Sequence, residues 1–115
     1  MKFIIHLFCL ALIFSLQAYD DNDLQRLKNT NRCENCNLTK ANLSKLDLSN
    51  ASLSGSDLSY ADLTNTNFFM ADLSFTTLVR SKIYISNLDS ANLEGADLTE
   101  ARLNGATLRN ANLID

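Results

Sequence analysis

The sequence has one histidine and three cysteines among 115 residues. The histidine, His6, lies in an N-terminal segment that we expect to be removed, so the mature chain would lack an imidazole. Nucleophilic triads need a histidine or an activated lysine. Five aspartates stand in isolated outward positions, where a solvated or turn-supporting role is favoured over paired acid–base chemistry: Asp47, Asp57, Asp62, Asp72 and Asp97. We therefore predict a protein that is not an enzyme, with no catalytic residue and no cofactor.

The net charge of the mature chain is also small. Without Met1 to Ala18, nine basic residues face thirteen acidic ones, a net charge of −4. Phosphate binding needs a basic surface, so this balance argues against nucleic acid as a partner. The same balance is too weak to indicate a strongly acidic mimic of DNA.

The first eighteen residues have the layout of a secretory signal peptide. Lys2 supplies a positive start, Phe3 to Leu16 is almost wholly apolar, and Ala18 precedes an acidic stretch. The apolar run is short for a membrane span, although an uncleaved anchor is the alternative. We expect cleavage after Ala18, no stable membrane insertion afterwards, and export to a periplasm, a thylakoid lumen or the cell exterior.

Residues 19–35 are predicted to cap whatever follows. Asp20 to Lys28 is typical of a short helix, with acidic residues in its first turn and basic ones near its end. Leu24 and Leu27 would share one face of that helix, and the polar run Asn29 to Asn31 would stop it. We expect the two leucines to cover the open end of the repeat that begins at Cys36.

Cys33 and Cys36 form a Cys-x-x-Cys pair with three possible roles. A zinc site needs four ligands, which the mature chain could supply only as a dimer, so no metal is expected. A redox pair lacks the usual strand–helix context. Counted back in fives from the repeat, both cysteines would point inward beside each other. A structural disulfide in an oxidising compartment is therefore favoured.

From Cys36 to Asp115 the chain repeats every five residues through sixteen units without a gap. The third position of each unit is large and apolar, and the first is small except at Leu46. The third positions are Leu38, Leu43, Leu48, Leu53, Leu58, Leu63, Phe68, Leu73, Leu78, Ile83, Leu88, Leu93, Leu98, Leu103, Leu108 and Leu113. Five matches neither a helix period of about 3.6 nor a strand period of two. Each unit should therefore be one short extended side and a turn, and four units should close a square coil of twenty residues.

Residues twenty apart should then stack. Opposite charges recur at this spacing in three outward pairs: Asp62 with Lys82, Arg80 with Glu100, and Asp89 with Arg109. The fifth position of each unit closes a corner, where glycine or asparagine tolerates a positive φ. Large residues hold this position at Tyr60, Met70, Phe75 and Ile85, and we predict a different turn geometry at those corners.

Several units, including Ala41-Asn42-Leu43, Ala61-Asp62-Leu63, Ala71-Asp72-Leu73 and Ala96-Asp97-Leu98, resemble the pentapeptide-repeat proteins. The leucine-rich start and the Cys-x-x-Cys before the first repeat resemble exported bacterial members. The resemblance implies an all-β fold, a right-handed quadrilateral β-helix of about four coils with a short N-terminal capping α-helix. It implies no shared catalytic residues.

Two surfaces are candidates for binding. Large apolar residues hold outward positions in the middle coils and form what we call the apolar belt: Tyr60, Phe69, Met70, Phe75, Val79, Tyr84 and Ile85. Such a belt is a common mark of an interaction surface, unless its side chains fold back flat over the corners. Because it wraps around the coil, only a subset can meet one partner.

The second candidate is the C-terminal coil, after which we expect no capping helix: Leu98, Leu103, Leu108, Leu113 and Ile114. In the gyrase-inhibiting members that the repeats resemble, such coils pair two chains end to end, so a homodimer is a hypothesis. For function, the sequence favours an exported scaffold that binds an unidentified protein. The alternative is an inhibitor of a topoisomerase such as gyrase that mimics DNA.

Overall fold

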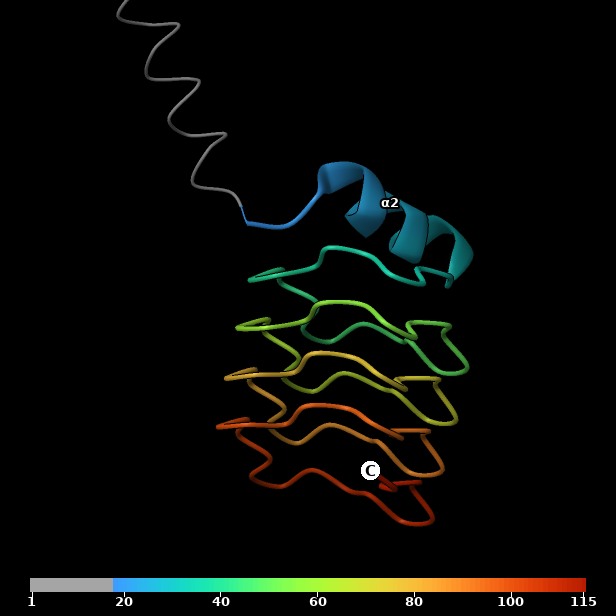
Figure 1. Ribbon diagram of the computed structural model, residues 1–115, viewed down its shortest axis with the longest axis vertical. Coiled ribbons are helices and arrows are strands. Elements are labelled where there is room, and N and C mark those ends of the chain that lie inside the picture. The colour runs from blue at the N-terminus through green and yellow to red at the C-terminus, as the bar shows by residue number, and fades with distance from the viewer. Residues whose placement is uncertain (1–17) are drawn as a thin grey trace, which may run out of the picture.

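The computed structural model describes residues 18–115 (Figure 1). The expected signal peptide, Met1 to Ala18, lies outside the described residues except for Ala18. A stack of coils runs down the long axis of Figure 1, and one helix lies across its N-terminal end. In this part of the chain, no helix combines the length and the apolar character needed to cross a membrane.

Helix α2 (Asp21–Thr30) has the two capped ends that the sequence predicts. Asp20 is its N-cap, and one carboxylate oxygen of Asp20 accepts a hydrogen bond of 3.1 Å from the Asp23 N–H. The helix ends at Asn31, which has a φ of 61° and donates its N–H to the Leu27 carbonyl. Leu24 and Leu27 are buried on the face toward the first coil. The predicted capping helix is confirmed.

The coils are joined by single parallel β-bridges, each between residues that are twenty apart. The bridges fall into four columns, which define the four sides of the stack. Side one holds Asn37, Asp57, Thr77 and Asp97; side two holds Asn42, Asp62, Lys82 and Arg102; side three holds Asp47, Asn67, Asn87 and Thr107; side four holds Arg32, Ser52, Asp72, Asn92 and Asn112. The predicted twenty-residue spacing is therefore confirmed. Within residues 18–115 each side contributes one bridge residue between turns and no longer strand.

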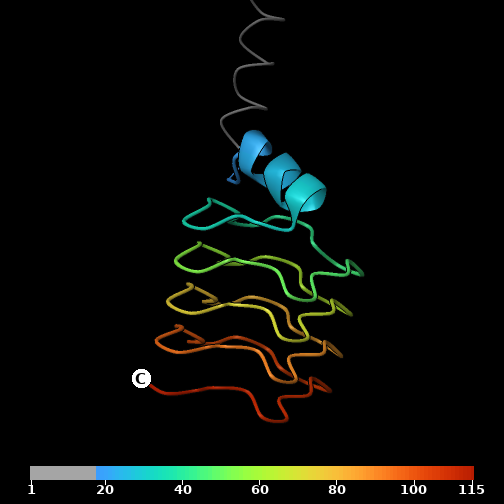
Figure 2. The same ribbon diagram turned by 90° about the vertical axis from the view of Figure 1, so that its right-hand side faces the viewer.

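Hydrogen bonds between coils involve three positions of each unit. The N–H groups of third and fifth positions donate to the next coil, as Leu58 does to Thr77 and Tyr60 to Val79, at 2.7 and 2.9 Å. The N–H of the second position donates to the preceding coil, as Asp57 does to the carbonyl of Cys36 at 2.9 Å. Each inner coil is therefore bonded to the coils on both sides of it, which accounts for the regular stack in Figure 2.

Every fifth position from Lys40 to Asn110 has a positive φ, whichever residue stands there. The φ values of Tyr60, Met70, Phe75 and Ile85 are 60°, 57°, 55° and 48°. The prediction of a different turn geometry at these corners is wrong. A left-handed conformation costs a side-chain-bearing residue about 1–2 kcal/mol. The fifth-position N–H must point at the next coil to make its bond, so closure of the coil imposes the conformation.

The core is filled by the first and third positions. Third-position side chains from Leu38 to Leu93 are at most 3% exposed. The buried hydroxyl groups at first positions donate to backbone carbonyls, as Thr66 does to Leu43 at 2.9 Å and Ser81 to Leu78 at 2.7 Å. No buried polar side-chain atom of the described residues lacks a partner. The exception among the first positions, Leu46, is half-buried and lines a pocket with Leu27 beneath the end of α2.

Candidate interaction surface and capped end

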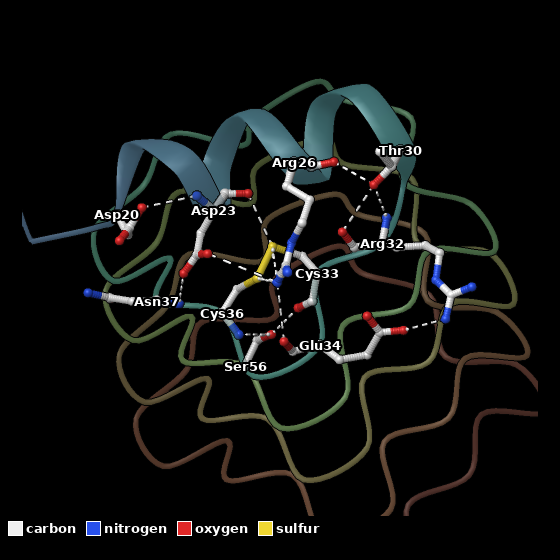
Figure 3. A network of polar contacts seen from close by, with 10 residues as sticks. All are labelled: Asp20, Asp23, Arg26, Thr30, Arg32, Cys33, Glu34, Cys36, Asn37 and Ser56. Carbon is white, nitrogen blue, oxygen red and sulfur yellow. Dashed lines mark hydrogen bonds and ion pairs between the residues drawn. A yellow bond between two sulfur atoms is a disulfide. The ribbon is translucent and has the colours of Figure 1, made fainter.

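Cys33 and Cys36 are joined by a disulfide under α2, and both are at most 1% exposed. Figure 3 shows the Arg26 side chain descending from α2 onto this disulfide. One guanidinium nitrogen, Nη2, lies 2.7 Å from Cys36 Sγ and 3.4 Å from the Glu34 carbonyl oxygen. The disulfide that the register favoured is present, and the arginine closes it off from the helix side.

Further contacts fasten the cap to the first coil. The Asp23 carboxylate accepts a hydrogen bond of 2.8 Å from the Asn37 N–H. The Asn37 carbonyl accepts one of 3.0 Å from the Asp20 N–H, and the Asn37 side chain donates to Ala18 at 2.8 Å. The cap is therefore held by the disulfide, by two buried leucines and by backbone hydrogen bonds.

One geometric observation would favour the hypothesis that Cys33 and Cys36 bind a metal ion. The two sulfur atoms and a carboxylate oxygen of Asp23 lie within 4.8 Å of one another. Because the sulfurs are bonded to each other, they are not the thiolates that zinc requires. The neighbouring Arg26 guanidinium would also oppose a cation. The arrangement is that of a structural disulfide.

The second-position aspartates and asparagines support turns. Each accepts a hydrogen bond from the backbone N–H two residues later, as Asp57 does from Ser59 and Asp97 from Thr99, both at 2.9 Å. The hydroxyl and N–H of Thr99 hold the pKa of Asp97 below its usual range, and Thr64 does the same for the pKa of Asp62. The turn-supporting role predicted for these aspartates is confirmed, including at Asp47 and Asp72.

Five residues of the apolar belt are well exposed: Tyr60, Phe69, Met70, Phe75 and Ile85, at 47%, 41%, 55%, 61% and 60%. Val79 and Tyr84 are half-buried. The belt occupies all four corners. Tyr60 and Val79 lie where side one meets side two, Tyr84 and Ile85 where side two meets side three, Phe69 and Met70 at the next corner, and Phe75 at the last.

Two belt side chains fold onto the corner of the next coil. A Cβ added at Gly95 would lie 2.6 Å from Phe75 Cδ1, and one at Gly105 would lie 2.8 Å from Ile85 Cγ2. Glycine at these corners is therefore needed because a neighbouring side chain occupies the space of its Cβ. The alternative to an interaction surface, in which the belt side chains fold back flat over the corners, is therefore correct in part. Phe75 and Ile85 rest on glycines, yet about three fifths of each remains exposed.

Polar contacts between coils order other members of the belt. Arg80 donates to the Tyr60 hydroxyl at 3.0 Å, lies over the Tyr60 ring and pairs with Glu100. Contact with Glu100, and secondly with Tyr60, raises the pKa of Arg80. Arg102 donates to the Tyr84 hydroxyl at 3.2 Å. Sequence reasoning missed both tyrosine contacts, although the twenty-residue spacing of Tyr60 and Arg80 was a usable signal.

The three predicted charge pairs have different outcomes. Arg80 and Glu100 form the predicted ion pair. Asp62 and Lys82 bridge through their backbones, and Lys82 contributes to the lowered pKa of Asp62, but no ion pair joins them within the described chain. The Asp89 carboxylate accepts a hydrogen bond of 2.9 Å from the backbone N–H of Arg109. In that third pair the bond is therefore made by the backbone.

The C-terminal coil is less buried than the coils before it. Leu98, Leu103 and Leu108 are half-buried, and Leu113 and Ile114 are 53% and 67% exposed. The last hydrogen bonds from an N–H group to the following coil run from Leu93 to the Asn112 carbonyl and from Gly95 to the Ile114 carbonyl. Within the described residues, the C-terminal coil thus presents an apolar surface together with an edge of unpaired N–H groups.

Comparison with known proteins identifies the repeat. The family model described as pentapeptide repeats matches residues 32–69, 47–82 and 86–115, with eight copies. Among solved structures, alr5209, a pentapeptide repeat protein from Nostoc PCC 7120, is 31% identical. The match covers 80% of this chain and 81% of that chain, with a TM-score of 0.69. No curated protein matches this chain.

HetL from Nostoc sp. strain PCC 7120, a pentapeptide repeat protein involved in regulating heterocyst differentiation, is 39% identical. The match covers 70% of this chain and 39% of that chain, with a TM-score of 0.51. QnrB1, a plasmid-mediated fluoroquinolone resistance protein, is 19% identical over 70% of this chain and 61% of that chain, with a TM-score of 0.34. The family model and the likeness to alr5209 imply a right-handed quadrilateral β-helix, and the chain belongs to the pentapeptide repeat family.

Proposed function

We propose that the chain is an exported, non-enzymatic scaffold that binds a protein partner through part of the apolar belt. The observation that carries the proposal is the exposure of five large apolar side chains, between 41% and 61%, in the middle of the stack. Neither the core nor the turns requires them there, because other units hold Ser or Thr at the fourth position, where Phe69 lies, and Lys, Asn, Ser or Glu at the fifth position, where the other four lie. Exposed apolar groups with a polar surround are typical of binding surfaces.

The rigid stack suits such a role. Four sides of a quadrilateral β-helix present flat faces whose outward residues can vary while the inward ones stay fixed. We take the sixteen units from Cys36 to Asp115 as four complete coils. The belt spans the second and third of these coils. The cap and first coil on one side, and the C-terminal coil on the other, then separate the belt from the ends of the described stack, where stacked repeats fray.

The test is a pull-down from an exported-protein fraction with the wild type and a Phe69→Ser/Tyr84→Ser variant. The matched control is Thr39→Ala/Ser59→Ala, which changes two outward residues of side one. We expect the belt variant alone to lose a captured protein, with identification by mass spectrometry and unchanged far-ultraviolet circular dichroism. Equal recovery of partners by all three proteins would remove the belt as the binding surface.

The export half of the proposal depends on Met1 to Ala18. Fractionation of the native host, with N-terminal sequencing, should find the protein outside the cytoplasm and beginning at or near Tyr19. A cytoplasmic protein with an intact N-terminus would contradict export and revive the alternative of a topoisomerase inhibitor that mimics DNA. That alternative has little support from a net charge of −3, and the likeness to QnrB1 is too low to carry an argument.

We further propose that two copies associate through the C-terminal coil. The half-buried Leu98, Leu103 and Leu108 and the exposed Leu113 and Ile114 would then be covered by their counterparts. Sedimentation equilibrium at high protein concentration should give twice the monomer mass. A Leu113→Lys/Ile114→Lys variant should remain a monomer, and a wild type that is monomeric at the same concentration would exclude the dimer.

A further inference from the structure

Charge is distributed unevenly around the stack. We define the basic face as side two with the two corner columns that bound it, Lys40-Tyr60-Arg80-Glu100 and Lys45-Asn65-Ile85-Gly105. This face holds five of the six basic residues between Cys36 and Asp115 and only two of the nine acidic ones, for a net charge of +3. The remaining surface of the same repeat holds one basic and seven acidic residues, a net charge of −6. The small net charge of the whole chain is therefore the sum of a positively charged face and a negatively charged remainder.

The cations of the basic face lie close together. Lys82 and Arg102 occupy bridge positions in successive coils, which are about 4.8 Å apart along a stack of this kind. Arg80 is two residues before Lys82, and the intervening Ser81 points into the core. All three cations are exposed. An anionic group placed against side two would therefore meet more than one of them at once.

Tyrosines hold two of these cations in place. The Tyr60 hydroxyl accepts from Arg80 at 3.0 Å, and the Tyr84 hydroxyl accepts from Arg102 at 3.2 Å. The Arg80 guanidinium also lies 5.8 Å from the centre of the Tyr60 ring. Side chains that are ordered beforehand lose less rotational freedom when a partner binds. Tyrosine and arginine are, in addition, among the residue types that are enriched at the energetic hot spots of protein interfaces.

The basic face also contains part of the apolar belt. Tyr60 and Ile85 are 47% and 60% exposed, and Tyr84 is half-buried. Phe69 and Met70, by contrast, lie at the corner between sides three and four, where the charges of Asp89 and Arg109 cancel. Of the belt corners, those of side two combine apolar area with positive charge, which distinguishes this side from the other three.

Resting on the proposed function, we infer that the basic face is the docking site and that its occupant is an acidic segment of a partner protein. Asp62 and Glu100 lie within the face. These carboxylates would repel the uniform negative charge of a nucleic acid or an anionic membrane. A polypeptide can place its carboxylates opposite Lys82 and Arg102 and an apolar or neutral residue opposite Glu100. Complementary charge of this kind sets partner choice and the rate of association.

The test uses the mature protein and a fluorescein-labelled short peptide of alternating glutamate and alanine, which has neutral residues available to lie opposite Glu100, with binding followed by fluorescence anisotropy at low salt. The variant is Lys82→Glu/Arg102→Glu. Its matched control, Arg32→Glu/Arg109→Glu, changes the net charge equally on sides three and four. Each exposed charge contact contributes little by itself, so two reversals should weaken binding about tenfold, while the control should change it less than about threefold. Added salt should weaken wild-type binding.

Three results would overturn the inference. The first is no binding of the glutamate–alanine peptide by the wild type, and the second is an equal loss in the variant and the control, which would mean that only net charge matters. The third is stronger binding to phosphatidylglycerol vesicles than to the peptide, abolished by Lys82→Glu/Arg102→Glu, which would make the face a lipid site. Unchanged circular dichroism and urea midpoints must accompany the variant, since all four substituted side chains are exposed.

This experiment and the pull-down fail independently. If the wild type still captures a partner that the Phe69→Ser/Tyr84→Ser variant loses, while Lys82→Glu/Arg102→Glu captures it normally, the belt is a binding surface and the acidic occupant is wrong. If the belt variant and the wild type recover the same proteins, the proposed function is wrong, whatever the result of the peptide-binding measurement.

Discussion

Substitution of Gly95 by alanine tests whether Phe75 rests on the corner of the next coil. An alanine Cβ at this position would lie 2.6 and 2.7 Å from Cδ1 and Cε1 of the Phe75 ring. Such distances are far below van der Waals contact, so the ring must swing outward. The φ of Gly95, +64°, adds the cost of placing a side chain in the left-handed region.

The size of the effect follows from the exposure of the ring. Phe75 is 61% exposed, so about two fifths of its surface is hidden at present. Full burial of a large apolar side chain contributes about 1.5–3 kcal/mol, and a displaced ring would therefore forfeit about 1 kcal/mol. The left-handed φ costs about 1 kcal/mol more. We expect Gly95→Ala to lower the free energy of unfolding by about 2 kcal/mol.

A double-mutant cycle separates the two contributions. In a Phe75→Ala background the clash is absent, so Gly95→Ala should cost only about 1 kcal/mol, a coupling of about 1 kcal/mol. Ser90→Ala is the matched control, because it places alanine at a corner with a φ of 59° that already carries a side chain. Urea unfolding at 25 °C, followed by far-ultraviolet circular dichroism, measures all five proteins. A coupling below about 0.3 kcal/mol would refute the contact between Phe75 and Gly95.

Three further predictions concern the cap, the turns and the core. Reduction with dithiothreitol, or Cys33→Ser/Cys36→Ser, should lower the free energy of unfolding by about 2 kcal/mol, the low end of the range for disulfides because the loop is short; an unchanged urea midpoint would contradict a stapling role. The pKa of Asp97 is lowered in the folded state, first by the Thr99 hydroxyl and then by the Thr99 N–H. The stability this adds is complete above the unfolded pKa and is lost as the pH falls through the folded one. Asp97→Asn should therefore flatten the acid side of the melting-temperature profile, and a profile as steep as the wild type would argue against it. Finally, Leu63→Ala, at a fully buried site, should cost about 2–5 kcal/mol, whereas Leu103→Ala in the half-buried C-terminal coil should cost clearly less by the same urea assay.

Much of the fold could be read from the sequence because the inward positions obey a strict rule. Burial at Leu38, Leu63 and Leu88 follows from the apolar third position, and coil size follows from the closure of four sides. The bounds of α2 were predictable within two residues, since Asp20 and Asn31 carry the chemistry of helix ends. These features are dictated by residue type and spacing, which is the information that a sequence contains.

The corners could not be predicted in the same way. Residue preference suggested that Tyr60 or Ile85 would avoid a positive φ, yet hydrogen bonding between coils decides the conformation at every corner. The role of Gly95 depends on where the Phe75 ring lies, which spacing alone does not give. In the candidate site, the exposure of Phe69 and Met70 was predictable from their outward positions. The hydrogen bond from Arg102 to the Tyr84 hydroxyl was not, because it depends on the conformations of two long side chains in neighbouring coils.

The fixed separation of twenty residues between bridged neighbours has a consequence for how this chain can change. Loss or gain of one residue would place outward residues in the core of every later coil, whereas loss of five would keep the core and rotate all later columns by a quarter turn. Removal of Ser56 to Tyr60, for example, would carry Lys82 and Arg102 onto side one, while removal of twenty residues would shorten the stack and leave every column in place. The pattern of charge around the stack can thus be rearranged in units of five residues while the apolar third positions stay in the core, and the surface of such a protein can change far faster than its interior.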